Sequence, residues 1–308
     1  MPINFDSFQE WEQYCTQENI VLWKPVVEYE MIQRNRTEQE VWDRISAAYL
    51  VMCEAIETGL TQNMTSRSGM INNGAKKIRD CTITVLSEEF KTLLVKTIAA
   101  KELNSCMGRI VAAPTAGASG IVPGVLSTLQ EIHHLPNQII YEGMLVAAGI
   151  ALIIERRASI SGSVGGCQAE TGAAAAMGAG AIVYCLKGSI KQVFDAVAIT
   201  IMNMLGLVCD PIAGLVEVPC VKRNGSAAVI AFSAAQIALA GDPSIIPVDE
   251  VVDTMGEIGQ NMDISLKETA LGGLAATPSG KAIAEKVLNR KIVPEELIET
   301  PDTDEIPN

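Results

Sequence analysis

The segment RTEQEVWDRISAAYLVMCEAIETGL (residues 36–60) carries the pattern that decides the fold class. Apolar side chains recur in it at spacings of three and four residues: Val41, Ile45, Tyr49, Met52 and Ile56. That period places them on one face of an amphipathic α-helix. Thr37 and Glu40 have the spacing of a capping box at the start of this helix, and Gly59 is predicted to end it.

Outward from this segment, the chain repeats one theme: a helix-like apolar stretch, then a loop of small residues. Further helices are predicted over residues 86–103, 138–157, about 173–186, 189–207, 225–240 and 247–262. Loops rich in Ser, Gly, Thr or Pro are predicted at 63–78, 104–124, 158–172 and 272–283. No β-branched run with a period of two has the length of a strand. We therefore predict an all-α fold, with one helical domain over residues 1–293 and an acidic tail over 294–308.

The bulk composition argues against several classes of protein. The chain has 308 residues and a net charge of −13, whereas a nucleic-acid groove needs a basic patch. The N-terminal segment MPINFDSFQEWEQYC lacks the basic-then-apolar order of a secretion signal. The apolar runs at 139–154, 171–186 and 225–241 are shorter than the ~18–20 residues that span a bilayer. We expect a cytoplasmic protein that binds neither nucleic acid nor membrane.

Three of the eight cysteines lie at breaks in apolar runs. Cys167 follows two glycines, Cys209 precedes Asp-Pro, and Cys220 follows a proline. In a reducing compartment such thiols favour a metal or catalytic role over disulfides. Cys106 borders a loop, without an apparent partner. The cysteines with helix-like or apolar surroundings, expected to pack as small hydrophobes, are Cys15, Cys53, Cys81 and Cys185.

Three loop thiolates suit several metals. A structural zinc site would need a fourth cysteine or histidine. The two histidines, His133 and His134, are adjacent in EIHHLPNQ, which is predicted to be a polar turn. From spacing alone, a metal site and three ordinary core cysteines are about equally supported.

Four segments resemble the α subunit of the iron–sulfur-dependent L-serine dehydratases (L-serine ammonia-lyases): RIVAAPTAGASGIVPG, SISGSVGGCQAETG, NMLGLVCDPIAGLVEVPCVKRN and GGLAATPSGKAI. The similarity runs from about residue 40 to residue 285. The resemblance implies that Cys167, Cys209 and Cys220 bind a [4Fe–4S] cluster on which the small-residue loops converge. The iron without a protein ligand would act as a Lewis acid. Pyridoxal phosphate is not expected, because the chain shows no βα phosphate cradle.

The same resemblance places a substrate site in the loops of small residues. The candidate substrate-binding residues are Ser66, Ser68, Gly69, Thr115, Ala116, Gly117, Ser161 and Gly162. Ordinary turn formation would explain Ser, Thr and Gly there equally well. The general base is unknown, and the candidates are Lys77, Ser68, Ser161 and a group from a partner chain. Lys222 or Arg223 is expected to pair with the substrate carboxylate, to balance cluster charge, or to be solvated.

The chain departs from the family pattern in two places. The family's serine loop reads like SGLTGGDAVK, whereas residues 68–77 read SGMINNGAKK, so that Asn72 and Asn73 replace two glycines. A substrate related to serine is therefore an alternative. The chain also lacks the ACT-like β region of single-chain members and their terminal cysteine. It looks like the α partner of a two-chain enzyme whose β subunit is ACT-like, with an oxygen-sensitive cluster.

The resemblance implies that the chain dehydrates and deaminates L-serine to pyruvate and ammonia, a reaction of amino-acid catabolism that feeds gluconeogenesis. One alternative is a related cluster-dependent lyase such as an L-cysteine desulfidase, in which sulfide would leave. Another is a non-catalytic scaffold or sensor subunit that bears the cluster, and a further one is a structural zinc protein. Turnover of L-serine against L-cysteine and analysis of bound metal discriminate between these hypotheses.

Overall fold

The computed structural model describes residues 4–289, and these residues form helices without any strand, which confirms the all-α prediction. Thirteen α-helices occur in this part of the chain. In chain order they are α1 (Phe8–Glu18), α2 (Trp23–Arg34), α3 (Glu38–Thr61), α4 (Gly74–Asp80), α5 (Glu88–Ser105), α6 (Ile121–His133), α7 (Asn137–Arg157), α8 (Gly162–Gly165), α9 (Ala173–Cys185), α10 (Ile190–Met202), α11 (Cys220–Leu239), α12 (Val248–Asn261) and α13 (Pro278–Leu288). The predicted acidic tail, 294–308, lies outside the described residues.

Four shorter helical turns complete the described chain. A π-helix, η1, spans Gln168–Gly172. Three 3₁₀ turns follow it: η2 (Ile212–Gly214), η3 (Ile264–Leu266) and η4 (Gly273–Ala276). The residues between α10 and α11 and those between α12 and α13 are therefore mostly irregular, and each region contributes to the site described below.

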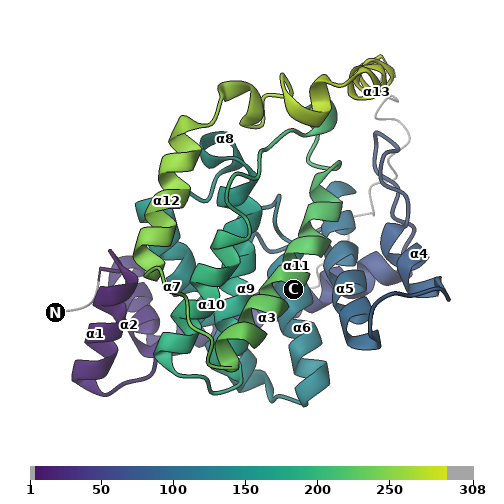
Figure 1. The fold of residues 1–308 in the computed structure, drawn as a ribbon. Coiled ribbons are helices and arrows are strands. Elements are labelled where there is room, and N and C mark those ends of the chain that lie inside the picture. Colours follow the sequence, from purple (N-terminus) through teal and green to yellow (C-terminus); the bar gives the residue numbers. More distant parts are fainter. Residues whose placement is uncertain (1–3, 290–308) are drawn as a thin grey trace, which may run out of the picture.

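Helix α9 lies at the centre of the bundle (Figure 1). It contacts α6, α7, α10 and α11, and its side chains are buried nearly all round. Its small residues allow these helices to approach closely: a methyl group added at Gly180 would lie 2.3 Å from Cδ1 of Ile150 on α7. Close packing of this kind explains why a chain with 4% aromatic residues still builds a continuous core.

Several predicted helix ends differ from the observed ones. The capping box of Thr37 and Glu40 is present at the start of α3. Gly59, however, does not end this helix, which continues to Thr61. A Cβ at Gly59 would lie only 2.3 Å from the carbonyl oxygen of Ala99 on α5. The glycine therefore serves the close contact of two helices rather than the termination of one.

Other predicted boundaries also differ from the observed ones, in part because glycine and proline do not always interrupt a helix. Helix α10 ends at Met202 instead of residue 207, and α11 begins at Cys220 instead of about residue 225. All four predicted loops contain helical turns: the start of α4 within 63–78, the start of α6 within 104–124, α8 and η1 within 158–172, and η4 with the start of α13 within 272–283. Proline is well tolerated where a helix begins, because the first amide groups lack partners in any case.

The cysteines outside the three breaks follow the packing prediction with one exception. Cys15 and Cys185 are buried and Cys53 is half-buried, whereas Cys81 is exposed after the end of α4. The two histidines lie at the exposed end of α6, as the polar-turn prediction requires.

Helix α7 is long and apolar enough to cross a membrane by length and composition alone. It is five residues longer than the 16-residue apolar run from which the prediction was made. Of its most apolar window, 56% is buried inside the protein. Contacts with α2 and α9 account for this burial, which is typical of a core helix.

One end of the bundle gathers the segments that carry chemistry. In Figure 1, α8, the chain that leads into α11 and the segment that follows α12 meet at this end, at the top of the view. The isolated bridge between Cys209 and Lys267 ties two of these segments together. Residues far apart in the sequence therefore become neighbours there.

Candidate active site

The three cysteines at sequence breaks converge at this end of the bundle. Cys167 precedes the π-helix η1, Cys209 lies between α10 and η2, and Cys220 is the first residue of α11. Their exposed fractions are 1%, 2% and 4%. The Cys167 and Cys209 thiols are hydrogen-bonded, and the charge of Cys167 is close enough to Cys220 to raise the pKa of the Cys220 thiol.

Local backbone structure explains why these thiols point inward. Helix α8 is followed by Gly166, where φ is +76° and an added Cβ would meet Met262 and the carbonyl oxygen of Leu207. Only glycine suits that conformation, which turns the chain so that Cys167 can start η1. The backbone of Cys209 is held by two bonds, since its amide donates to Leu266 O at 2.8 Å and its carbonyl accepts from Glu268 N at 2.7 Å.

The thiols differ in acidity. The hydrogen bond from Cys209, aided by the Arg223 guanidinium, lowers the pKa of Cys167. The same bond raises the pKa of Cys209, whose thiol is the donor. Burial raises the pKa of Cys220 to about 12. Cys167 is therefore the first of the three to become a thiolate, the form that binds metals.

Arg223 links this thiol group to the rest of the fold. Its Nη1 lies 3.6 Å from Cys167 Sγ and donates to Val208 O at 2.8 Å. The same nitrogen lies 2.8 Å from Oδ1 of Asp210, whose other carboxylate oxygen accepts from Leu274 N. Lys222, the neighbouring candidate, is exposed. Of the two, Arg223 is the one placed to offset negative charge on sulfur.

Lys101, on α5, is a second cation beside the thiols. Its side chain is fully buried, and its ammonium donates to Asn104 Oδ1, Ala116 O and Val216 O. Burial lowers the pKa of this lysine, while the charges of Cys220, Glu170 and Glu217 oppose that shift, in decreasing order. A buried ammonium needs such partners, because an uncompensated charge in the interior is costly.

Glu217 connects the lysine to the serine loop. Its Oε2 accepts hydrogen bonds from Ser66 Oγ at 2.6 Å and from Ser68 Oγ. All three side chains are buried. Gly69, with φ of +79°, makes the turn that returns the loop to Ser66. The two predicted serines therefore point at a carboxylate rather than at solvent.

Glu170, in the π-helix, contacts the loop that precedes α6, as Glu217 contacts the serine loop. Thr115 donates its hydroxyl to Glu170 Oε1. Gly117 lies against the same carboxylate, since a Cβ there would be 2.4 Å from both carboxylate oxygens. The intervening Ala116 is exposed and offers its carbonyl to Lys101. All three predicted residues of this loop thus contact the Lys101–Glu170 pair.

Of the two predicted residues on and before α8, Gly162 is buried beside a cysteine and Ser161 is partly exposed. Gly162 lies beside Cys209, with 3.1 Å between its ideal Cβ position and the sulfur. Ser161 is partly exposed and bonds to Ser163 at 2.8 Å. Glu268, on the segment after α12, faces Gly162 at 3.4 Å, and burial together with the charge of Glu170 raises its pKa.

Lys77, a candidate base, is exposed on α4. The groups that sequence reasoning missed are Lys101, Glu170 and Glu217. Both glutamates lie in segments already quoted for their cysteines, CQAETG and LVEVPC. The position of each glutamate within an Ala/Gly-rich or apolar run is the sequence feature that could have indicated a buried carboxylate.

The site offers three buried thiols as donors for a metal or a cluster. Within residues 4–289, no three His, Cys, Asp or Glu side chains are placed to hold one metal ion. A cube of iron and sulfide binds each thiolate at a different iron, so its ligands need not meet at one point. Three buried thiols with Arg223 and Lys101 nearby suit such a group, because both cations offset thiolate charge.

These features define a class: an all-α protein with a buried site of thiols, carboxylates and a lysine at one end of its bundle. The sequence model described as "Serine dehydratase alpha chain" matches residues 17–275. The chain therefore belongs to the serine dehydratase alpha chain family.

Individual relatives agree with this family. The chain is 40% identical to the L-serine dehydratase, alpha chain, of Peptoniphilus asaccharolyticus, over 87% of this chain and 93% of the relative. It is also 40% identical to the probable L-serine dehydratase, alpha chain, of Bacillus subtilis, over 92% and 95%. For the L-serine dehydratase of Streptomyces coelicolor the identity is 39%, over 78% of this chain but only 54% of the longer relative.

Proposed function

We propose that the chain is the α subunit of an enzyme that converts L-serine to pyruvate and ammonia. Relatives that match it over most of their length are named L-serine dehydratases, which are carbon–oxygen lyases. The observation on this chain that carries the proposal is the convergence of Cys167, Cys209 and Cys220 beside the Ser66–Ser68–Glu217 group, through Lys101.

We assign the three cysteines to a [4Fe–4S] cluster. When bound, such a cluster supplies a Lewis acid for the leaving hydroxyl at the iron that has no protein ligand. Arg223 would offset charge at Cys167, and Lys101 would do so at Cys220. The interior position of the thiols excludes bulk water from them.

We assign the removal of the α-proton to Ser68 acting with Glu217. The Ser68 hydroxyl already donates to Glu217, so its oxygen can accept the substrate proton while its own proton passes to the carboxylate. The electrons of the Cα–H bond then form the Cα=Cβ bond, and the Cβ–O bond breaks with loss of hydroxide. The aminoacrylate product tautomerises and hydrolyses in water to pyruvate and ammonia.

The remaining polar groups suit a small zwitterion. Thr115 and Ser66 present hydroxyls held by carboxylates, and Lys101 balances both Glu170 and Glu217. Groups held by several bonds need little reorganisation when substrate binds, which favours orientation. Ser161, which lies near Cys209 but at the partly exposed rim, is assigned to the entrance.

We further propose a separate β subunit. The names of two relatives call them alpha chains, and the longer Streptomyces relative extends well beyond the matched region. The segment between α4 and α5 exposes 86% of Ile83 and 97% of Val85, which supports a docking surface for a second chain.

The test is metal analysis and turnover after anaerobic purification, with the partner chain present for turnover. We expect about four irons and four sulfides per chain and pyruvate from L-serine. Cys167→Ser should lose iron and activity, whereas Cys15→Ser, at an equally buried thiol, should keep both. Sulfide from L-cysteine without pyruvate from L-serine would contradict the proposed substrate. Zinc in place of iron would contradict the cluster.

A further inference from the structure

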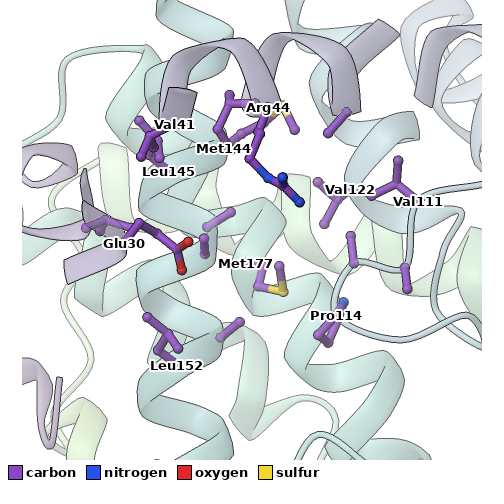
Figure 2. A pocket seen from close by; sticks show the side chains of 18 of the residues that line it. Glu30, Val41, Arg44, Val111, Pro114, Val122, Met144, Leu145, Leu152 and Met177 are labelled. Atoms are coloured by element: carbon purple, nitrogen blue, oxygen red, sulfur yellow. The ribbon is translucent and has the colours of Figure 1, made fainter. Parts of the chain in front are cut away.

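A cavity that is partly open to solvent lies away from the cysteines. It has a volume of about 620 Å³ and is lined by α2, α3, α6, α7, α9 and residues 111–114 (Figure 2). Its walls are mainly apolar, with Met144, Leu145 and Met177 among the lining side chains. None of the three cysteines, Glu170, Glu217 or Lys101 lines it. The cavity therefore shares none of these groups with the candidate active site, although Pro114 and Ile160, which line it, directly precede Thr115 and Ser161. Its size is typical of a small-molecule site.

Charged side chains stand at one side of these apolar walls. Figure 2 shows the Arg44 guanidinium and the Glu30 carboxylate directed into the cavity. Glu30 is already paired with Arg36 at 2.8 Å. Arg44 is exposed and acts on the Glu40 carboxylate through charge, but within residues 4–289 it makes no hydrogen bond or ion pair shorter than 4 Å. Its guanidinium donors can therefore turn to a ligand.

The sign of the charge at this cavity is opposite to that of the whole chain. Three arginines (34, 36 and 44) line it against two glutamates (30 and 155). The chain as a whole carries −13. A local excess of guanidinium over an apolar wall favours a ligand with one negative head and an apolar body. Arginine suits a carboxylate head especially, because its planar fork matches the two oxygens.

We propose that this cavity binds a monocarboxylate with an apolar chain, with Arg44 on the carboxylate and the chain between α3, α7 and α9. The site is additional to the proposed serine site and does not depend on that function. The chain of such a ligand would contact Met144 and Met177, whose unbranched side chains adapt to different shapes.

The test is calorimetric titration of the full-length anaerobic protein with hexanoate, octanoate and decanoate. Each added methylene should raise affinity by about fourfold while the cavity has room. Octylammonium, with the same chain length and the opposite charge, should not bind. Equal binding of octanoate and octylammonium, or no binding of any carboxylate, would overturn the proposal.

Two variants locate the site. Arg44→Gln should weaken octanoate binding roughly tenfold or more, because a charged partner is lost. Ala148→Phe, which fills the cavity from α7, should abolish binding. Arg79→Gln changes an exposed arginine that pairs with Asp80, and binding should be unaffected. Unfolding curves check that each variant is folded.

Octanoate affinity that is unchanged in Arg44→Gln or in folded Ala148→Phe would overturn the assignment. Binding to the isolated chain that disappears in the complex with its partner chain would also overturn it, and would instead assign the cavity to the subunit interface.

Discussion

Replacement of Lys101 by methionine tests whether the buried ammonium holds the site together. Lys101→Met keeps an unbranched chain but removes the charge that lies beside Glu170 and Glu217. It also removes three donated hydrogen bonds, to Asn104, Ala116 and Val216. The two carboxylates, both less than 10% exposed, would remain.

The expected cost follows from two opposed effects. Breaking a direct buried ion pair costs about 3–5 kcal/mol, and Lys101 acts on Glu170 and Glu217 through charge at longer range, so the cost here should lie at the lower end. Relief of the desolvation that lowers the lysine pKa offsets part of this cost. We therefore expect Lys101→Met to lower the free energy of unfolding by ~3 kcal/mol. Lys96→Met, on the same helix, removes a cation paired with the 65%-exposed Glu131 and should cost less than about 1 kcal/mol.

Urea unfolding of the iron-free protein at pH 7 measures both variants without any contribution from bound metal. A double-mutant cycle with Glu217→Gln isolates the pair: the second change should cost less in the Lys101→Met background than alone. Equal losses for Lys101→Met and Lys96→Met, together with an additive cycle, would refute the view that Lys101 compensates these carboxylates.

Two further predictions concern packing and pH. Gly117→Ala places a Cβ 2.4 Å from the Glu170 carboxylate and should cost about 1–3 kcal/mol with a loss of serine turnover. Gly256→Ala, whose nearest contacts are at 3.3 Å, should cost less in the same assays, and equal effects would contradict the close contact. Burial raises the pKa of Cys15 and of Cys185 from 9.0 to about 12. As the pH rises, the unfolded chain therefore loses these protons before the folded protein does. The free energy of unfolding should fall between pH 9 and 12, by about 1 kcal/mol per pH unit for each thiol. Urea midpoints measured across that range check this, and a slope that Cys15→Ala does not flatten would contradict it.

The spacing of apolar residues predicts the helices well where one helix face packs against the core and the other faces solvent. Helix α3 is the clearest case, with its capping box in place. The prediction failed where glycine has a packing role, as at Gly59, and where proline begins a helix, as at Pro219 before α11. Glycine and proline can each interrupt a helix or be compatible with one, and the sequence alone does not show which applies at these two positions.

Part of the geometry of the candidate site follows from the sequence. The loop segments rich in Ser, Gly and Thr predict four residues that each contact a buried carboxylate: Ser66, Ser68, Thr115 and Gly117. The carboxylates themselves and Lys101 were missed, because charged residues are normally exposed and periodicity cannot reveal a compensated interior charge. The sequence points to Lys77 as a candidate base because this lysine lies in the segment that matches the family's serine loop, whereas Lys101 lies in no such segment.

The asparagines that depart from the family's serine loop bear on the proposed substrate. Asn73 has φ of +53°, the left-handed region that glycine favours and that asparagine tolerates better than most residues. Its side chain accepts from Met64 N and donates to Asn63 and Asn72. Asn72 is exposed and pairs with Thr65 across the loop. Both replacements therefore secure the outer side of the loop.

The inner side of the same loop is held independently. Ser66 and Ser68 donate to Glu217, and at the far end of the loop Glu102 accepts from the amides of Gly74 and Ala75. Asparagine at 72 and 73 can thus replace glycine without turning either serine away from the carboxylate. Since substrate would meet the inner side, the departure from the family pattern favours retention of L-serine over a change to a related substrate.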